Sequence, residues 1–177
     1  MAGIALGVAA LIVVLSVMNG FQKEVRDRML SVLSHIEVTA PNGLAQWEEI
    51  ADTLSKQPNV LGVAPMVSSQ GLLSRADSMR GVAIRGVDPQ LEGRVSDLPK
   101  QFVVGSMSDL KPGQFGVVLG TQLAGTLGVR VGDRVNLLVP EGDLTPAGTM
   151  PRMRALVVVG ITDSGHYEYD STLAVLH

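Results

Sequence analysis

Residues 1–22 have the sequence MAGIALGVAALIVVLSVMNGFQ, in which no side chain carries a charge. An α-helix rises about 1.5 Å per residue, so a segment of this length spans ~30 Å, about the thickness of the hydrocarbon core of a bilayer. We therefore interpret the segment as a transmembrane helix. A buried core helix and a cleavable signal peptide are the alternatives, but no Lys or Arg precedes the apolar run and no A-x-A-like cleavage site follows it.

The charged region after this run continues the helical pattern. Apolar residues recur at three- and four-residue spacing from Phe21 to Leu33, which predicts one continuous helical stalk to about Ser34. The cations that follow the apolar run favour a cytoplasmic flank, but acidic residues are interleaved with them. Charge counting therefore does not fix the side of the membrane, and a helix that begins at residue 1 suggests a further stretch before it.

The composition excludes several classes of protein. The chain has 177 residues and a mass of 18.6 kDa, and 46% of its residues are hydrophobic, a share that rules out intrinsic disorder. It contains no cysteine, which excludes thiol catalysis, Cys-ligated zinc and iron–sulfur clusters. Its net charge of −3 provides no broad basic field, so we expect no nucleic-acid partner.

Residues 35–100 have the pattern of a compact α+β unit. The predicted elements are a short strand over 36–40, an amphipathic helix over 44–57, and strands over 60–68, 71–74 and 79–86. Pro58-Asn59 ends the helix, and Asp88-Pro89 opens a turn or a short helix.

Residues 101–177 are predicted to be mainly β. The expected elements are a strand over 116–120, a helix over 121–128, a hairpin over 129–139 around Gly132-Asp133, a strand over 155–162, and a last strand within TLAVLH at 172–177. We therefore divide the chain into a transmembrane helix with its stalk (1–34), a first subdomain (35–100) and a second subdomain (101–177).

The most unusual segment is PEGDLTPAGTMP at 140–151. Three prolines and two glycines in twelve residues argue against a helix or a regular sheet, so we predict a protruding loop. Proline lowers the ordering cost of binding and methionine adapts to apolar surfaces, so the segment is either a recognition finger or an uncommitted surface loop. Arg152 and Arg154 lie two residues apart on the next strand and share a face, as a fixed pair of cations or as part of a solvated face.

The sequence contains no recognisable catalytic or metal-binding pattern. The three histidines lack the paired spacing of a zinc site. Asp163, Ser164 and His166 resemble a catalytic triad only in composition, because triads assemble from residues that are distant in sequence. No GxxxxGK[ST] motif for a nucleotide phosphate is present. We therefore expect a non-catalytic chain with no metal and no cofactor of its own.

Four stretches resemble the LolC/LolE permease subunits of the bacterial lipoprotein-releasing ABC transporter. They are GIALGVAALIVVLSVMNGFQKEVRDRML at 3–30, SHIEV at 34–38, IRGVDPQ at 84–90 and VVLGTQLAGTLGVRVGDRVNLLVP at 117–140. They occur in the family's order, and the resemblance as a whole covers nearly the whole chain. Macrolide-exporter and FtsX-like permeases share the general plan but not these stretches.

This resemblance implies a fold, a location and a set of partners. The fold is an α+β periplasmic domain of two subdomains, like that of the macrolide exporter, which follows a helix in the bacterial inner membrane. The implied partners are the cytoplasmic ATPase subunit LolD, which would bind ATP, a second permease subunit that is LolE-like or a copy of this chain, and the periplasmic carrier LolA, which receives the lipoproteins. The permease would transmit motion while ATP hydrolysis belongs to LolD.

The resemblance also implies where the carrier binds. LolC-type subunits recruit LolA through a hairpin extension called the hook and a nearby polar surface called the pad. Residues 140–151 match the hook, and the candidate contacts are Pro140, Leu144, Pro146, Met150 and Pro151. The candidate pad residues are Arg154, which matches a pad arginine, its neighbour Arg152, and Asn136 and Met153, which stand where polar or cationic residues are expected. LolE-type subunits lack the hook, whereas SHIEV and AIRGVDPQ are closer to LolE, a mixture that suits the hybrid permease LolF.

The outer end of the transmembrane helix is the candidate site where lipoproteins enter. Val14, Val17, Met18 and Phe21 would offer apolar surface to acyl chains, although helix–helix packing would use the same residues. Two other functions stay open: a permease of another macrolide-exporter or FtsX-like system, and a membrane-anchored periplasmic enzyme, which would need a clustered polar pocket. The later transmembrane helices of a permease are not in this sequence, which suggests a fragment.

Overall fold

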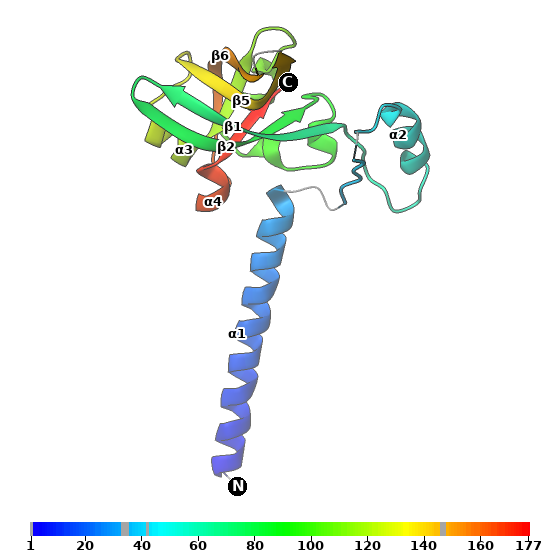
Figure 1. The fold of residues 1–177 in the computed structure, drawn as a ribbon. Coiled ribbons are helices and arrows are strands. Elements are labelled where there is room, and N and C mark those ends of the chain that lie inside the picture. The colour runs from blue at the N-terminus through cyan, green and yellow to red at the C-terminus, as the bar shows by residue number, and fades with distance from the viewer. Residues whose placement is uncertain (1, 33–35, 42, 146–147) are drawn as a thin grey trace. The chain divides into compact units, whose positions relative to one another are not determined.

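The structure is a computed structural model, and it describes residues 2–32, 36–41, 43–145 and 148–177. The chain divides into two units, Met1–Glu37 and Val38–His177. The first unit consists of the helix α1 (Ala2–Val32), which is drawn in blue in Figure 1. Its part Ala2–Lys23 is long and apolar enough to cross a membrane, and none of that part is buried. The predicted continuous helix is therefore confirmed as far as Val32, whereas its predicted end at Ser34 lies outside the described residues.

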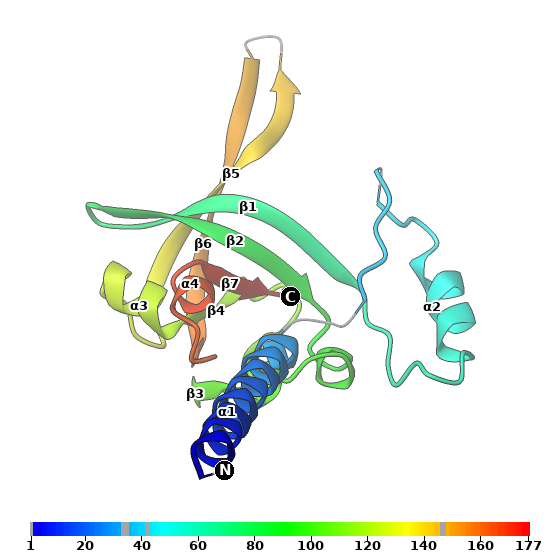
Figure 2. The same cartoon turned by 90° about the horizontal axis from the view of Figure 1, so that it is seen from below.

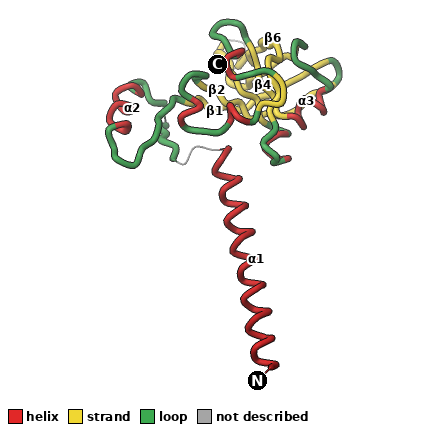
Figure 3. The backbone as a smooth tube through the Cα atoms, turned by 180° about the vertical axis from the view of Figure 1, so that it is seen from behind, coloured by secondary structure: helices red, strands yellow, loops and turns green. Residues whose placement is uncertain are grey.

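The second unit is built on one sheet of seven strands that closes on itself. In spatial order the strands are β3 (Phe102–Val104), β6 (Gly148–Thr162), β4 (Gly116–Gly120), β7 (Leu173–Leu176), β2 (Ser78–Val87), β1 (Met66–Arg75) and β5 (Arg134–Thr145). Because β5 also pairs with β6, all strands except β3 form a closed ring, and closure removes the free edges that an open sheet exposes. Figure 3 shows the strands gathered into one body.

Two apolar clusters stabilise this barrel on opposite sides of its wall. Side chains alternate between the two faces of a strand, so neighbouring residues of one strand enter different clusters. In β4, Val117 and Leu119 belong to the larger cluster, whereas Val118 belongs to the smaller one. The larger cluster also contains Leu73, Val82, Leu137, Leu156 and Val158, and the smaller one contains Leu98, Met107, Leu110, Leu173 and Val175. β4 is therefore buried on both faces, as its apolar sequence GVVLG predicts.

Short helices and turns cover the rest of the barrel. The helix α3 (Thr121–Leu127) buries Leu123, Ala124 and Leu127, and it ends at Gly128, whose φ of +62° is a left-handed conformation that suits glycine. The other helices are α2 (Trp47–Ser55), α4 (Tyr167–Asp170) and the 3₁₀ turns η1 (Glu92–Arg94), η2 (Leu98–Lys100) and η3 (Met107–Asp109). The strands predicted over 79–86 and 116–120, and the helices predicted over 44–57 and 121–128, are confirmed within a few residues, whereas the strand predicted over 155–162 is only the second half of β6.

Three predicted elements are wrong. Residues 36–40 are not a strand, because alternation alone forms none without a partner strand to bond with. Residues 60–65 are irregular, and β1 is one continuous strand that pairs with β2 along its whole length instead of two strands. Residues 129–139 are not a hairpin, because the turn at Gly132-Asp133 leads from α3 into β5 and the Gly132 N–H donates to the carbonyl of Val158, 2.8 Å away on β6.

The predicted division of the second unit at residue 100 stays a prediction. The sheet itself runs across that point, since β2 pairs with β7 and β1 pairs with β5.

Candidate functional site

The hairpin of β5 and β6 has a base inside the barrel and an outer end beyond it. At the base β5 pairs with β6 and also with β1, where Leu72 faces Leu138. The pairing of β5 with β6 continues past Val139 and Arg152 to Thr145 and Gly148. Figure 2 shows this outer end projecting past β1 and β2. The segment 140–151 is therefore paired backbone over most of its described length, and the prediction against regular sheet is wrong.

The positions of Pro140 and Pro151 explain how a sheet accommodates this sequence. The ladder has pairs at Val139–Arg152 and at Asp143–Met150, so residues 140–142 on β5 stand opposite Pro151 alone on β6. Such an irregularity interrupts ladder hydrogen bonds, and proline is tolerated there because it has no N–H to donate. Pro140 and Pro151 thus fall at the one level of the hairpin where a missing donor costs little.

The predicted hook residues lie on this outer end. The backbone of Pro140, Leu144, Met150 and Pro151 is placed in the two strands. The side chains of these four residues, and Pro146 altogether, lie outside the described part of the structure. Their role as carrier contacts stays a prediction.

The predicted pad residues lie together at the base of the outer end, but on two opposite faces of the hairpin. Arg152 and Arg154 continue the face that Leu156 and Val158 use to enter the core. Met153 stands opposite Leu138, and Asn136 stands opposite Ala155, so both belong to the other face. All four pad side chains are exposed. The structure therefore brings the two cations together and separates them from Asn136 and Met153.

Arg154 stacks on an aromatic ring that the sequence analysis did not identify. The Cζ atom of its guanidinium lies 4.9 Å from the centre of the Phe115 ring, within the range of a cation–π interaction. Phe115 directly precedes β4, and its φ of +51° is in the left-handed region, which is unusual for an aromatic residue. No motif marks this contact in the sequence, because it depends on the pairing of β4 with β6.

The residues proposed to meet lipoproteins share one face of α1. Val14, Val17, Met18 and Phe21 follow a spacing of three and four residues. Their side chains are between 50% and 69% exposed. These four side chains thus form a continuous apolar stripe along α1.

A buried carboxylate elsewhere in the barrel, that of Glu92, has hydrogen-bond partners. The guanidinium of Arg85 donates to the carboxylate of Glu92 over 2.8 Å, and the Ser96 hydroxyl donates to the same oxygen over 2.6 Å. The Glu92 side chain is only 1% exposed. Burial raises the pKa of the neighbouring Tyr169 hydroxyl, against the opposite effect of Arg85. The buried Glu92 carboxylate is therefore hydrogen-bonded, as expected for a charged group that belongs to the fold.

The residues Asp163, Ser164 and His166 do not form a triad. The backbone N–H of His166 donates to the Ser164 hydroxyl over 3.2 Å, which is a turn contact. The backbone N–H of Ser164 donates to both carboxylate oxygens of Asp170, each 3.1 Å away. Burial raises the pKa of Asp170, and these hydrogen bonds oppose that effect.

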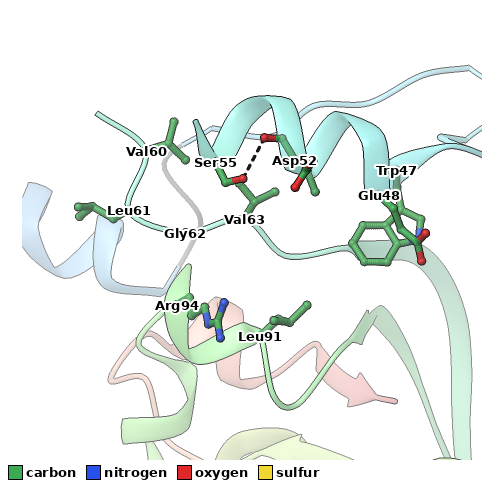
Figure 4. Close-up of a pocket in the computed structure, with 11 residues that line it drawn as sticks. Trp47, Glu48, Asp52, Ser55, Val60, Leu61, Gly62, Val63, Leu91 and Arg94 are labelled. Atoms are coloured by element: carbon green, nitrogen blue, oxygen red, sulfur yellow. Dashed lines mark hydrogen bonds between the residues drawn. The ribbon is translucent and has the colours of Figure 1, made fainter. Parts of the chain in front are cut away.

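One shallow pocket, with a volume of about 350 Å³, lies between α2 and the turn η1 (Figure 4). Its lining combines the apolar side chains of Trp47, Leu61 and Leu91 with the charged Asp52 and Arg94. None of its eleven lining residues is a histidine or a lysine. The ionisable side chains of the pocket are the carboxylates of Glu48 and Asp52 and the guanidinium of Arg94.

The chain is similar in sequence to a known domain family and to known proteins. A family model described as the MacB-like periplasmic core domain matches residues 1–175. The chain is 45% identical over 177 residues to the lipoprotein-releasing system transmembrane protein LolC of Neisseria meningitidis serogroup B, an alignment that covers 99% of this chain and 43% of the relative. It is 42% identical over 176 residues to LolC of Xylella fastidiosa strain 9a5c, covering 99% and 42% of the two chains.

A LolE protein is also similar. The transmembrane protein LolE of Haemophilus influenzae is 34% identical over 180 residues, which cover 98% of this chain and 43% of that protein. The chain thus spans less than half the length of these relatives. The resemblance to the LolC/LolE permease subunits that the four sequence stretches predict is confirmed.

Proposed function

Because this chain belongs to the MacB-like periplasmic core domain family, and matches LolC and LolE over nearly all of its residues, we propose that it is part of the permease of a lipoprotein-releasing ABC transporter. In this function the permease passes lipoproteins from the inner membrane to the periplasmic carrier LolA.

The proposal places α1 in the bacterial inner membrane and the barrel in the periplasm. The uncharged part of α1 has the length of a membrane span, and the family is described by its periplasmic core. The predicted division of that core into subdomains over 35–100 and 101–177 is part of this proposal. The apolar stripe of Val14, Val17, Met18 and Phe21 would receive acyl chains at the outer end of the span.

Other chains complete the proposed machine. The sequence has no phosphate-binding motif, so ATP hydrolysis is assigned to the cytoplasmic subunit LolD and the chain itself is not an enzyme. A second permease subunit, LolE-like or identical to this one, would complete the membrane part.

The observation that carries the proposal is the outer end of the β5–β6 hairpin. It projects past the neighbouring strands, and it has two adjacent cations where it joins the barrel. A soluble partner can bind a projecting hairpin without disturbing the core of the barrel. We assign it the role of the hook that captures LolA, with Arg152 and Arg154 as the cationic part of the pad.

The test shortens the hairpin at a level where it can close again. Because Val139 and Arg152 face each other, the dipeptide Asn-Gly can replace residues 140–151 as a tight turn. The full-length membrane protein in lipid nanodiscs is then tested for capture of purified LolA. We expect capture to be lost while the circular dichroism spectrum of the barrel is retained.

A matched control uses the same dipeptide in another hairpin. Ala76 and Asp77 form the two-residue turn between β1 and β2, because Arg75 pairs with Ser78, so replacing them with Asn-Gly leaves the hook intact. This variant should capture LolA normally. A shortened, folded hairpin that still captures LolA would overturn the assignment of the hook. A wild-type protein that never binds LolA would overturn lipoprotein release and favour another exporter of the same family.

A further inference from the structure

We infer that Phe115 is a positioning residue that holds Arg154 ready to bind a carboxylate on the surface of the carrier. The inference rests on the proposed function, because it adds a residue to the docking surface at the base of the hook. Four observations lead to it: the stacking geometry, the backbone conformation of Phe115, its anchoring to β6, and the hydrogen-bonding state of Arg154.

The stacking geometry places a cation on an exposed ring. The guanidinium carbon of Arg154 lies 4.9 Å from the centre of the Phe115 ring. The ring is 49% exposed, so it is a platform at the surface more than a part of the core. A guanidinium that stacks on an aromatic face keeps its N–H groups at the edge of the plane, where they remain able to donate.

The backbone of Phe115 is held in an unfavourable conformation. Its φ of +51° brings Cβ close to the backbone, and glycine would adopt this conformation without that cost. Strained residues persist where the surrounding structure fixes them, and they concentrate at sites of function. The surrounding structure therefore holds the backbone of Phe115 in place, which fixes the point from which its ring extends.

The position of the ring is fixed relative to Arg154 because both belong to one part of the sheet. The carbonyl of Phe115 accepts a hydrogen bond from the N–H of Val157 over 3.0 Å, three residues after Arg154 on β6. The next residue, Gly116, pairs with Val157 in the ladder. The ring and the cation therefore move together with the base of the hairpin.

Arg154 is available to a partner. Within the described part of the chain it takes part in no hydrogen bond and no ion pair, and the ring of Phe115 is its recorded contact. A guanidinium presents a fork of donors that matches a carboxylate in two parallel hydrogen bonds. Pre-orientation of a long flexible side chain lowers the entropy cost of making those bonds. The chemistry of the site thus selects an acidic group on the docked protein.

A double-mutant cycle tests this coupling on the full-length protein in nanodiscs. The affinity for LolA is measured for the wild type, F115L, R154A and the double variant. Leucine keeps an apolar side chain at position 115 but removes the π face. We expect F115L to weaken binding about 2- to 5-fold, the range of an exposed cation–π interaction, and F115Y to retain wild-type affinity. In the R154A background, F115L should have no further effect.

A second readout does not depend on LolA. The ring current of Phe115 should shift the NMR signal of the Arg154 side-chain Nε–H group, and F115L should remove that shift while F115Y keeps it. Tyr167→Leu is the matched control, because Tyr167 is an exposed aromatic residue (71%) at the start of α4. It should change neither the affinity nor the Arg154 signal.

The outcomes separate the inference from the function on which it rests. If F115L binds LolA as tightly as the wild type, or weakens binding equally with and without Arg154, Phe115 does not position Arg154. An Arg154 signal without a ring-current shift overturns the positioning whatever LolA does. A wild type that shows the shift but does not bind LolA overturns the proposed function and, with it, the carrier as the source of the carboxylate.

Discussion

The base and the outer end of the β5–β6 hairpin are continuous in the chain but differ in what supports them. At the base, Val135, Leu137, Leu156 and Val158 are at most 7% exposed, and β5 has a neighbouring strand on each side. Beyond Val139 and Arg152, the described ladder joins the two strands only to each other. The contrast shows that one hairpin can be part of the core at one end and be supported only by its own pairing, within the described ladder, at the other.

The largest expected effect on stability comes from a buried ion pair of the barrel. Glu92→Ala removes the partner of Arg85 and leaves a buried cation, so we expect the free energy of unfolding to fall by about 3–5 kcal/mol. Urea denaturation measures the change. The control Asp52→Ala removes an ion pair with Lys56 whose side chains are 75% and 74% exposed, and it should cost less than about 1 kcal/mol. Equal losses in the two variants would contradict the role assigned to burial.

The next effect compares two neighbouring levels of β6. Leu156→Ala opens a cavity in the larger apolar cluster and should cost about 2–5 kcal/mol. Met153→Ala, three residues closer to the outer end, removes a side chain that is 67% exposed and should cost less than about 0.5 kcal/mol. The same urea experiment measures both. A large loss for Met153→Ala would move the boundary of the core toward the outer end.

A smaller effect depends on pH. Burial raises the pKa of Asp170 above its ordinary value of 3.8, so the folded state holds this proton more tightly than the unfolded state. The resulting stabilisation is complete below the ordinary pKa and is lost as the pH rises through the folded pKa. The melting temperature of Asp170→Asn, relative to wild type, should therefore increase between pH 3.5 and pH 7. A difference that stays constant over this range would show that Asp170 titrates normally.

The last expected change in stability, at the outer end, is also small. Replacement of residues 140–151 by Asn-Gly removes backbone whose described ladder joins only β5 and β6, so the free energy of unfolding should change by less than about 1 kcal/mol. Thermal unfolding of the variant beside the Ala76-Asp77 control measures this. A loss as large as that of Leu156→Ala would show that the outer end belongs to the cooperative unit of the barrel.

Local sequence patterns predict those elements whose type is determined by their own residues. The uncharged run of α1, the periodicity of α2 and the apolar GVVLG of β4 each identify their element. The register of the hairpin is different, because it depends on partners elsewhere in the chain. Gly132-Asp133 has the composition of a hairpin turn, but it is the turn that leads from α3 into β5, and the Gly132 N–H donates to the carbonyl of Val158 on β6.

The candidate site is predictable only in part for the same reason. The proximity of Arg152 and Arg154 follows from strand alternation, and the structure agrees. The separation of Asn136 and Met153 from these cations requires the register of β5 with β6. The contact of Arg154 with Phe115 joins residues 39 positions apart through the pairing of β4 with β6, which no local motif encodes.

The position of β7 has a consequence for how the barrel is made. Leu173–Leu176 is the last strand in sequence, but it lies between β2 and β4 and supplies the bonds that join them. During synthesis, β2 and β4 each have an edge without its partner strand until this short segment is made. The body can become cooperative only then, and a chain cut before residue 173 is expected to be a substrate for quality-control proteases and prone to aggregation.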